Sequence, residues 1–298
     1  MNSLALPPDF DARVLRNERM AKHTSWHVGG PADLFFTPLD VADLAAFLRS
    51  LDRATPVMWI GLGSNLLVRD GGIRGAVIDT HGVFAELDRL DDNEVWAGAG
   101  VACAKLAKQC IKWGLGPAEF FAGIPGTLGG ALAMNAGAFG GETWNHVVSV
   151  ATLDRDGVRR ERPAADYQVG YRHVDGPVDE WFLGARLRFE QRPGVSSEDI
   201  RILLARRKAT QPIGEWSCGS VFTNPPGDHA ARLIDSAGLK GFRIGGARVS
   251  EMHANFIVND GTATAADIEQ LIAHVRTTVE QMHGVKLTPE VRMVGEKT

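Results

Sequence analysis

One glycine-rich stretch constrains this chain more than any other feature of its sequence. It runs from Gly123 to Glu142, and seven of its twenty residues are glycine. A segment with so few side chains cannot form a core by itself, so it brings backbone close to another group. Thr127 is placed to cap a short helix that contains Ala131–Met134, and a helix that begins after glycines offers unpaired N–H groups to an anion. The stretch indicates either a phosphate cradle or a glycine-rich packing turn.

The composition is that of an ordinary soluble globular protein. The chain has 298 residues, 44% of them hydrophobic, and a formal net charge of −4. This length is sufficient for two domains, each with its own core. There is no basic excess that would favour nucleic acid, and no apolar stretch approaches the length of a membrane span. The first residues lack the basic and apolar regions of a signal peptide, so a cytoplasmic protein is expected.

The cysteines predict neither disulfides nor a metal site. There are three of them, at irregular spacing, which is not the pattern of a disulfide framework. Cys103 and Cys110 lie seven positions apart in a predicted helix, so they share a face and are expected to be small core residues. Neither a CxxC nor an HExxH pattern occurs, and no metal is expected.

The pattern of the first half predicts parallel strand–helix–strand units followed by antiparallel strands. Asp40 begins a helical pattern in which apolar residues recur at spacings of three and four. An Asp156–Gly157 pair predicts a hairpin turn between extended segments. The expected strands are 32–38, 56–61, 75–80, 95–98, 147–154 and 181–190, and a further helix is expected at 101–113. This half is therefore predicted to be α+β.

The second half is expected to begin after a polar segment at Gln191 that contains Pro and Gly. A helix is predicted over about 197–207. The clearest helix is the one capped by Thr264 and ended by Gly284, because its apolar residues lie on one face. A strand over 286–294 closes the chain.

The common nucleotide fingerprints are missing. The segment Gly98–Cys103 has two of the three glycines of G-x-G-x-x-G, and no Gly-Lys pair occurs, so a Walker A loop is excluded. The GLGSN sequence at Gly61–Asn65 is more informative, because it follows an apolar strand and adds the side chains of Ser64 and Asn65. Two glycine-rich turns at strand ends could hold the diphosphate of a dinucleotide such as FAD from both sides.

Several longer motifs carry a resemblance to one family. In chain order they are TSWHVGGPAD (24–33), GLGSNLLVRD (61–70), the stretch 123–142, GYR (170–172), CGSVFTNP (218–225), AGLKGFRIGGARVSEMHANFIVN (237–259) and LTPEVR (287–292). In this order, over nearly the whole chain, they resemble the flavin-dependent UDP-N-acetylenolpyruvoylglucosamine reductases of bacterial cell-wall synthesis.

The resemblance implies a fold and a reaction. The fold would be α+β, with a two-subdomain FAD-binding module of the vanillyl-alcohol-oxidase type and a C-terminal α+β substrate-binding domain. The implied boundaries are 1–82 and 83–195 for the two FAD-binding subdomains and 196–298 for the substrate domain. The implied reaction uses non-covalent FAD and NADPH to reduce the enolpyruvyl group of a UDP-sugar to a lactyl ether. No nucleic acid, membrane insertion or obligate protein partner is implied.

Three residues match the catalytic positions of the family. Arg172 would hold the substrate carboxylate, where negative charge develops during hydride addition. Ser220 matches the proton donor, and Glu290 matches the catalytic glutamate. Without the resemblance, these residues would be interpreted as a surface arginine, a turn serine and an exposed strand carboxylate.

The resemblance also implies binding residues. For FAD they are Gly61, Gly63, Ser64, Asn65, Leu66, Gly123, Ile124, Pro125, Gly126, Thr127, Gly130 and Asn135. For the substrate they are Asn224, Lys240, Arg243 and His253. The tyrosine-bearing insertion found in some members between the arginine and serine motifs is missing, so the chain resembles the shorter subtype.

Two other classes of protein remain as alternatives. One is an FAD-dependent oxidase of the same fold that acts on an alcohol or a sugar. The other is a nucleotide-binding module without catalysis. Neither needs Ser220 and Glu290 together with Arg172, so the reductase is the favoured hypothesis.

Overall fold

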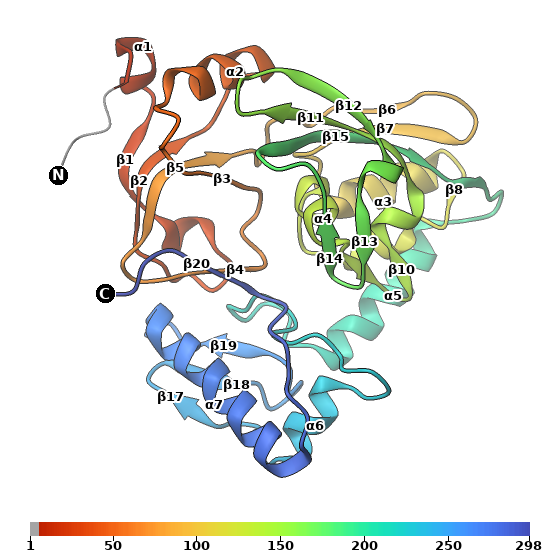
Figure 1. Cartoon of the computed structure of the whole chain (residues 1–298). Helices are drawn as coiled ribbons and strands as arrows, with labels where there is room; N and C mark the ends of the chain where they lie inside the picture. Colours follow the sequence, from red (N-terminus) through yellow and green to blue (C-terminus); the bar gives the residue numbers. More distant parts are fainter. Residues whose placement is uncertain (1–5) are drawn as a thin grey trace. The chain divides into compact units, whose positions relative to one another are not determined.

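The computed structural model describes residues 6–298, and these form two compact units (Figure 1). Unit 1 comprises the chain up to Leu15, Leu34–Gly61 and Ala76–Ala205, and unit 2 comprises Arg16–Asp33, Leu62–Gly75 and Arg206–Thr298. The chain therefore passes between the units several times, whereas each predicted domain is one continuous segment. The predicted boundaries at 82 and 195 stay a prediction.

The first sheet has the strand order β1-β2-β5-β3. Its strands are β1 (Leu15–Arg19), β2 (Pro31–Phe36), β5 (Ile73–Asp79) and β3 (Val57–Ile60). Strands β3 and β5 are parallel, as the sequence predicts. Helix α2 (Val41–Ser50) begins at Asp40, whose carboxylate accepts a hydrogen bond from Asp43 N at 2.8 Å. Its apolar face packs into a core of unit 1 through Leu44, Phe47 and Leu48.

The second sheet has five strands, lies within unit 1 and corrects one prediction. Its order is β12-β11-β15-β7-β6, with β12 (Arg159–Pro163), β11 (Val147–Asp154), β15 (Glu180–Arg188), β7 (Glu94–Gly98) and β6 (Leu87–Arg89), all antiparallel. The turn at Asp156–Gly157 joins β11 to β12 and not to the strand near residue 181. Strand β12 was missed because its RRERP sequence has no apolar alternation, which fits a mostly exposed edge strand.

A helical core supports this second sheet. Helix α3 (Cys103–Lys112), the 3₁₀ turn η2 (Glu119–Gly123) and helix α4 (Leu128–Met134) pack with β7 and β15. The side chains of Cys103 and Cys110 are fully buried, and burial raises the pKa of each thiol to about 12. Their predicted role as small core residues is confirmed.

Unit 2 is built on a three-stranded antiparallel sheet, β17 (Arg243–Ile244), β18 (Ala247–Val249) and β19 (Ile257–Asn259). Helix α7 (Ala265–His283) packs beside β17 and β18, and α6 (Ala230–Ser236) packs on α7 (Figure 1). Thr264 and Asp267 form a capping box at the start of α7, and Gly284 ends it with φ +68°. The Asp70 carboxylate also accepts from Ala265 N and Ala266 N, at 3.1 and 2.9 Å.

The last strand is shorter than predicted. Strand β20 (Arg292–Val294) pairs in parallel with β4 (Leu66–Val68), whereas 286–294 was expected. Pro289 forms an isolated bridge with Phe222, and Glu290 therefore lies before the strand. Proline has no N–H for a ladder hydrogen bond, which accounts for the late start.

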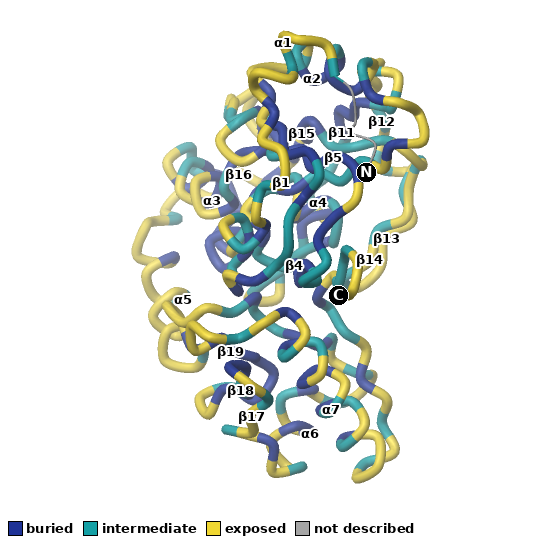
Figure 2. The backbone as a smooth tube through the Cα atoms, turned by 90° about the vertical axis from the view of Figure 1, so that its left-hand side faces the viewer, coloured by how far each residue is buried: buried dark blue, intermediate teal, exposed yellow. Residues whose placement is uncertain are grey.

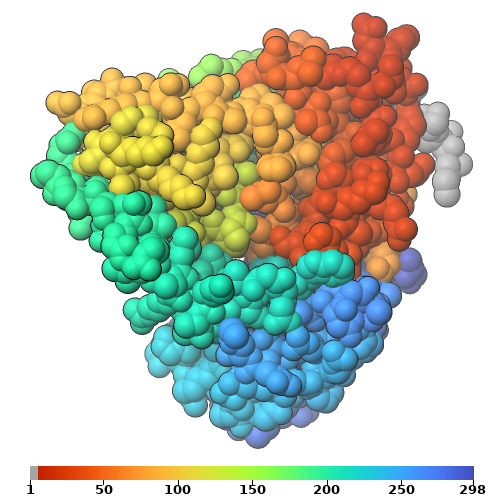
Figure 3. Space-filling view, turned by 180° about the vertical axis from the view of Figure 1, so that it is seen from behind, coloured from red at the N-terminus to blue at the C-terminus, as the bar shows by residue number. Residues whose placement is uncertain are grey.

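The remaining elements are short, apart from one surface helix. Helix α5 (Ser197–Thr210) buries only Ile200 among its described residues, and it is mostly exposed in Figure 2 and green on the surface in Figure 3. The short elements are α1 (Pro8–Asp11), η1 (Met20–His23), β8 (Leu115–Gly116), β9 (Gly137–Ala138), β10 (Gly141–Glu142), η3 (Thr143–His146), η4 (Ala164–Asp166), β13 (Gln168–Gly170), β14 (His173–Asp175) and β16 (Glu190–Gln191).

Replacement of Trp26 by alanine is expected to lower the free energy of unfolding by about 3–5 kcal/mol. The Trp26 side chain lies fully buried in the core of unit 2, and its Nε1 donates to Ile257 O at 2.7 Å. Alanine would leave a cavity and a buried carbonyl without a donor. Denaturant unfolding measures the change, with Trp216→Ala as control because Trp216 is 44% exposed. Equal losses in the two variants would contradict this packing.

Candidate active site

The start of α4 departs from the expected phosphate cradle. The N–H groups of Leu128 and Gly129 donate to Val101 O and Ala99 O, both at 2.8 Å, so neither is available to an anion. Thr127 occupies the capping position, but among residues 6–298 its side chain makes no capping hydrogen bond. The expectation of a side-chain cap is therefore wrong. The expectation that the first N–H groups of the helix are unpaired is also wrong for these two, because carbonyl groups of the preceding turn at residues 99–101 accept from them.

Four of the five predicted glycines fall into two groups. A Cβ on Gly61 would clash with the Thr127 hydroxyl, one on Gly63 with the His23 carbonyl, and one on Gly123 with the Phe139 ring. These three glycines are therefore required by the packing of the chain itself. Gly130 is different, because it is exposed and its Cβ would meet only Thr127 Oγ1, at 4.0 Å. Of these four positions, Gly130 leaves room for a bound group.

Asn135 joins three segments behind the glycine-rich stretch. It ends α4 in the left-handed conformation, with φ +46°, and is 2% exposed. Its Nδ2 donates to Glu142 Oε2 and to Gly170 O, both at 3.0 Å, and its Oδ1 accepts from Trp144 N at 3.1 Å. Both donors of the amide are used within the protein, and the predicted contact of Asn135 with a cofactor stays a prediction.

Arg172 is held at the tip of the β13–β14 hairpin in a left-handed conformation, with φ +57°. Such a conformation is costly for a residue other than glycine, and it often marks a functional position. Its Nη2 donates to Gly137 O at 2.9 Å and its Nη1 to Asn135 O at 3.3 Å. Its guanidinium carbon lies 5.0 Å from the centre of the Tyr171 ring. The guanidinium is thereby oriented against the loop that follows α4.

In unit 2, the structure brings the Ser220 and Glu290 segments together. Val221, which follows Ser220, accepts a hydrogen bond from Glu290 N at 2.8 Å through its carbonyl. Asn65 fixes the same segment, because its Nδ2 donates to Glu290 O at 3.0 Å. Two of the three predicted catalytic residues therefore lie on adjoining backbone segments, while Arg172 belongs to unit 1.

The second half of the GLGSN turn lies beside the serine motif in unit 2. Cys218 is buried, and its Sγ lies 3.5 Å from Leu66 O. Burial raises the pKa of this thiol to about 12, so it is a packing residue. Ser64 is half-buried, and Leu66 begins β4 as a buried side chain. This turn thus provides Ser64 and Asn65 as polar side chains next to the Ser220 segment.

The predicted substrate-binding residues have partners within unit 2. Lys240 pairs with Asp235 at 2.9 Å, and Arg243 pairs with Asp260 at 3.2 Å. Asn224 Oδ1 accepts from Ala230 N at 3.1 Å and so caps α6. Burial lowers the pKa of His253, the fourth member of the set, below its ordinary value. Their binding role stays a prediction.

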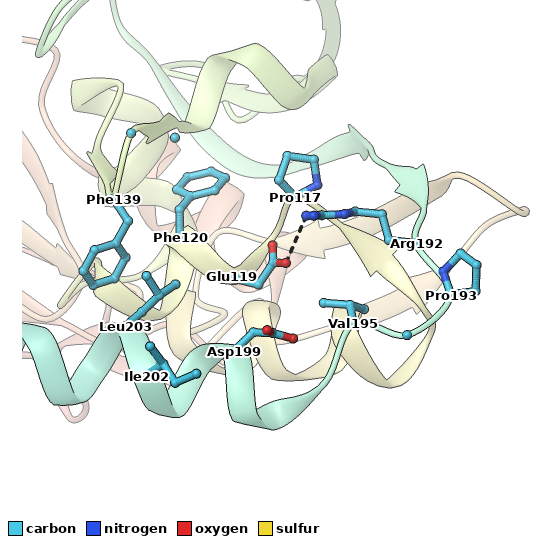
Figure 4. Close-up of a pocket in the computed structure, with 13 residues that line it drawn as sticks. Pro117, Glu119, Phe120, Phe139, Arg192, Pro193, Val195, Asp199, Ile202 and Leu203 are labelled. Carbon is cyan, nitrogen blue, oxygen red and sulfur yellow. Dashed lines mark hydrogen bonds and ion pairs between the residues drawn. The ribbon is translucent and has the colours of Figure 1, made fainter.

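A pocket of about 680 Å³ opens in unit 1 (Figure 4). Phe120, Phe139, Ile202 and Leu203 form much of its apolar wall. Its charged groups are paired within the protein: Arg192 donates to Glu119 Oε1 at 3.1 Å, and Asp199 accepts from Ser196 N at 2.8 Å. No predicted site residue lines this pocket, and it is not part of the candidate site.

The sequence did not single out two residues that support the site. Glu142 accepts a hydrogen bond from Asn135, and Trp144 N donates to the same side chain. The only signal was that Glu142 is the one charged residue at the end of a glycine-rich stretch.

Within the described part of the chain, no helix is long and apolar enough to cross a bilayer, and no cluster of His, Cys, Asp or Glu could hold a metal ion.

Two family models match the chain. One is the FAD binding domain, at residues 32–161, and the other is the C-terminal domain of UDP-N-acetylenolpyruvoylglucosamine reductase, at residues 211–294. The reductase of that name from Alkalilimnicola ehrlichii is 60% identical over 282 residues, which is 94% of each chain. The one from Methylococcus capsulatus is 56% identical over 283 residues, 95% of this chain and 93% of that one.

A solved structure agrees with these matches. The crystal structure of the UDP-N-acetylenolpyruvylglucosamine reductase from Thermus caldophilus is 33% identical, with a TM-score of 0.81, and the match covers 94% of this chain and 98% of that chain. The fold thus defines an FAD-binding protein with a separate C-terminal domain, and the predicted α+β fold class is confirmed. More specifically, the chain belongs to the UDP-N-acetylenolpyruvoylglucosamine reductase family.

Proposed function

We propose that this protein is an NADPH-dependent oxidoreductase that reduces the enolpyruvyl group of UDP-N-acetylglucosamine enolpyruvate to the lactyl ether, giving UDP-N-acetylmuramate for peptidoglycan synthesis. The observation that carries the proposal is 60% identity to a reductase of this name over 94% of both chains. The adjoining Ser220 and Glu290 segments also support it, because reduction of the double bond needs a positioned proton donor.

The residues of the chain fit FAD as the cofactor. The exposed Gly130 at the start of α4 leaves room for a bound group, and Ser64 and Asn65 offer side-chain hydrogen-bond partners. We propose that these residues hold FAD together with the other predicted positions of the two glycine-rich turns. When bound, FAD supplies hydride transfer between NADPH and the substrate.

Each proposed catalytic residue has a distinct role. The reaction adds a hydride to the terminal carbon of the enolpyruvyl group and a proton to the adjacent carbon. Arg172 stabilises the negative charge that develops on the carboxylate, because its guanidinium is already oriented by two backbone carbonyls. Ser220 gives the proton, and Glu290 acts as the catalytic glutamate that the family resemblance implies. Lys240, Arg243, His253 and Asn224 contact the rest of the sugar nucleotide.

The finer predictions about partners and location are part of the same proposal. The substrates are small molecules, and the enzyme works in the cytoplasm without nucleic acid, membrane insertion or an obligate protein partner. The net charge of −4 supports the absence of a nucleic-acid role.

An anaerobic experiment tests the proposed function. The purified holoprotein is first titrated with NADPH, which should bleach the flavin absorbance near neutral pH. Addition of the enolpyruvyl sugar nucleotide should then restore the absorbance in the absence of oxygen. Recovery only after oxygen is admitted would instead indicate an oxidase, and no bleaching by NADPH would contradict the proposed reductant.

Substitution of Gly130 by glutamate is expected to give folded protein that purifies without FAD. The Gly130 position is exposed and has ordinary helical geometry, so the side chain should be tolerated by the fold while its volume and negative charge oppose a diphosphate. Flavin content per protein, with circular dichroism to check folding, measures the effect. Gly130→Ala is the matched control and should keep more flavin. Full flavin in the glutamate variant would show that the cradle lies elsewhere.

Steady-state kinetics are expected to be ping-pong, with inhibition by excess of the second substrate. The family resemblance implies that NADPH and the sugar nucleotide occupy one site in turn. Double-reciprocal plots at several fixed concentrations of the other substrate should therefore give parallel lines. Intersecting lines, together with binding of both substrates to one protein molecule, would rule out the shared site.

A further inference from the structure

The position of Ser220 is not set by regular secondary structure. Ser220 follows Gly219, which has φ +73°, and lies in neither a helix nor a strand. Its side chain is half-buried. The location of its hydroxyl therefore depends on what fixes the residues that follow it, Val221 and Phe222.

One residue, Asn255, fixes both of these residues, Phe222 through its side chain and Val221 through its backbone. The Oδ1 of Asn255 accepts from Phe222 N at 3.0 Å, and its Nδ2 donates to Phe222 O at 2.8 Å. The backbone carbonyl of Asn255 also accepts from Val221 N at 2.9 Å. An amide side chain thus gives this segment the hydrogen bonds that a neighbouring strand gives within a sheet. Since Val221 O pairs with Glu290 N, the same contacts reach the glutamate segment.

Asn255 is itself held in one orientation. It is 4% exposed and lies in the turn that leads into β19. Its backbone N–H donates to His253 Nδ1 at 3.3 Å. Rotation of the amide by 180° would bring Nδ2 against the Phe222 N–H and Oδ1 against the Phe222 carbonyl, so the hydrogen-bond network fixes the assignment of the two atoms.

We propose that Asn255 is the residue that positions Ser220 for proton transfer. The inference rests on the proposed function, because it needs Ser220 as the donor. Asn255 acts through the Val221 and Phe222 backbone and not by contact with a reacting atom. Loss of its two side-chain hydrogen bonds should let the Ser220 turn shift, and a misplacement of about 1 Å can cost a factor of about 10² in rate.

The test uses the FAD-loaded full-length enzyme and two variants. Asn255→Leu removes both side-chain hydrogen bonds with little change in volume. Asn255→Asp is a near-isosteric second variant, in which a carboxylate oxygen replaces the donor to Phe222 O. Each should lower kcat by about 10- to 100-fold while the KM for the sugar nucleotide changes much less. Flavin reduction by NADPH should remain unchanged.

Asn259 provides a matched control in the same unit. It is 5% exposed and donates from Nδ2 to Trp26 O at 2.7 Å, while its Oδ1 accepts from Gly261 N and Ala263 N. Asn259→Leu should therefore destabilise unit 2 without affecting kcat. Amide hydrogen exchange gives a readout that does not depend on activity: the Phe222 amide should exchange faster in Asn255→Leu and be unchanged in Asn259→Leu.

A double-mutant cycle with Ser220→Ala separates positioning from general stability. If Asn255 acts through Ser220, then Asn255→Leu should change kcat by no more than about twofold in the Ser220→Ala background. A decrease of the same size in both backgrounds, or an equal decrease in Asn259→Leu, would overturn the inference while leaving the proposed function intact. Undiminished turnover in Ser220→Ala alone would instead overturn the proposed role of Ser220.

Discussion

Replacement of Ser220 by alanine is expected to slow turnover of the sugar nucleotide by about 10²- to 10⁴-fold, the usual contribution of general acid catalysis. Oxidation of NADPH should stay nearly intact, because that half-reaction needs no proton from this hydroxyl. Stopped-flow measurement of flavin absorbance follows each half-reaction separately. Mixing with NADPH reports the first, and mixing with the enolpyruvyl sugar nucleotide reports the second.

Cysteine at the same position is the informative companion to alanine. Ser220→Cys keeps a proton to give, so it should retain more activity than Ser220→Ala. The structure allows both changes, since Ser220 is half-buried and lies in an irregular segment held mainly by the residues after it. If alanine slowed both half-reactions equally, or neither of them, Ser220 would be a turn residue. Glu290 or a bound water would then be the next candidate for the donor.

Arg172→Ala is expected to slow the second half-reaction by about 10²- to 10³-fold, through hydride transfer itself. The charge that the guanidinium stabilises develops on the substrate carboxylate in that step. The variant also removes the donors to Asn135 O and Gly137 O, so a structural contribution must be separated from the electrostatic one. Single-turnover measurements with the sugar nucleotide give the rate, and thermal unfolding gives the stability.

Two further variants at this position make that separation. Arg172→Gly relieves the left-handed conformation, with φ +57°, while removing the charge, so it should be at least as stable as Arg172→Ala and equally slow. Arg172→Lys keeps a positive charge but lacks the planar fork, and it should recover only part of the rate. Full activity in either the glycine or the alanine variant would assign the carboxylate to another cation.

Local patterns predicted the regular elements well. The spacing of apolar residues, Thr264 and Gly284 predicted α7 and both of its ends. Asp40 marked the start of α2, and the apolar strand at 56–61 became β3. Each of these signals depends on residues within one or two turns of each other, so it is present in the sequence itself. The charged strand β12 carried no such signal and was missed.

The candidate site was predicted from motifs and stays a prediction, and the tertiary structure adds contacts within the protein for several of those residues. Asn135 matches a cofactor position, and its side chain also joins Glu142, Gly170 and Trp144. Asn224 matches a substrate position, and its side chain also caps α6. An amide can make the same hydrogen bonds to a ligand or to the protein backbone, and the choice depends on segments far away along the chain.

The sequence by itself determined that the chain is α+β and which helices are amphipathic. It also located two glycine-rich turns, of which the first follows strand β3 as expected, whereas the second follows the 3₁₀ turn η2 and not a strand. It could not determine why each glycine is there. The absence of a Cβ at Gly61 leaves room for Thr127, and at Gly63 it leaves room for the carbonyl of His23. Gly130, in contrast, has open space beside it. Only the tertiary structure decided this, because the absence of a Cβ permits close packing and ligand binding equally well. Which group faces a given glycine depends on contacts between residues that are distant in the sequence.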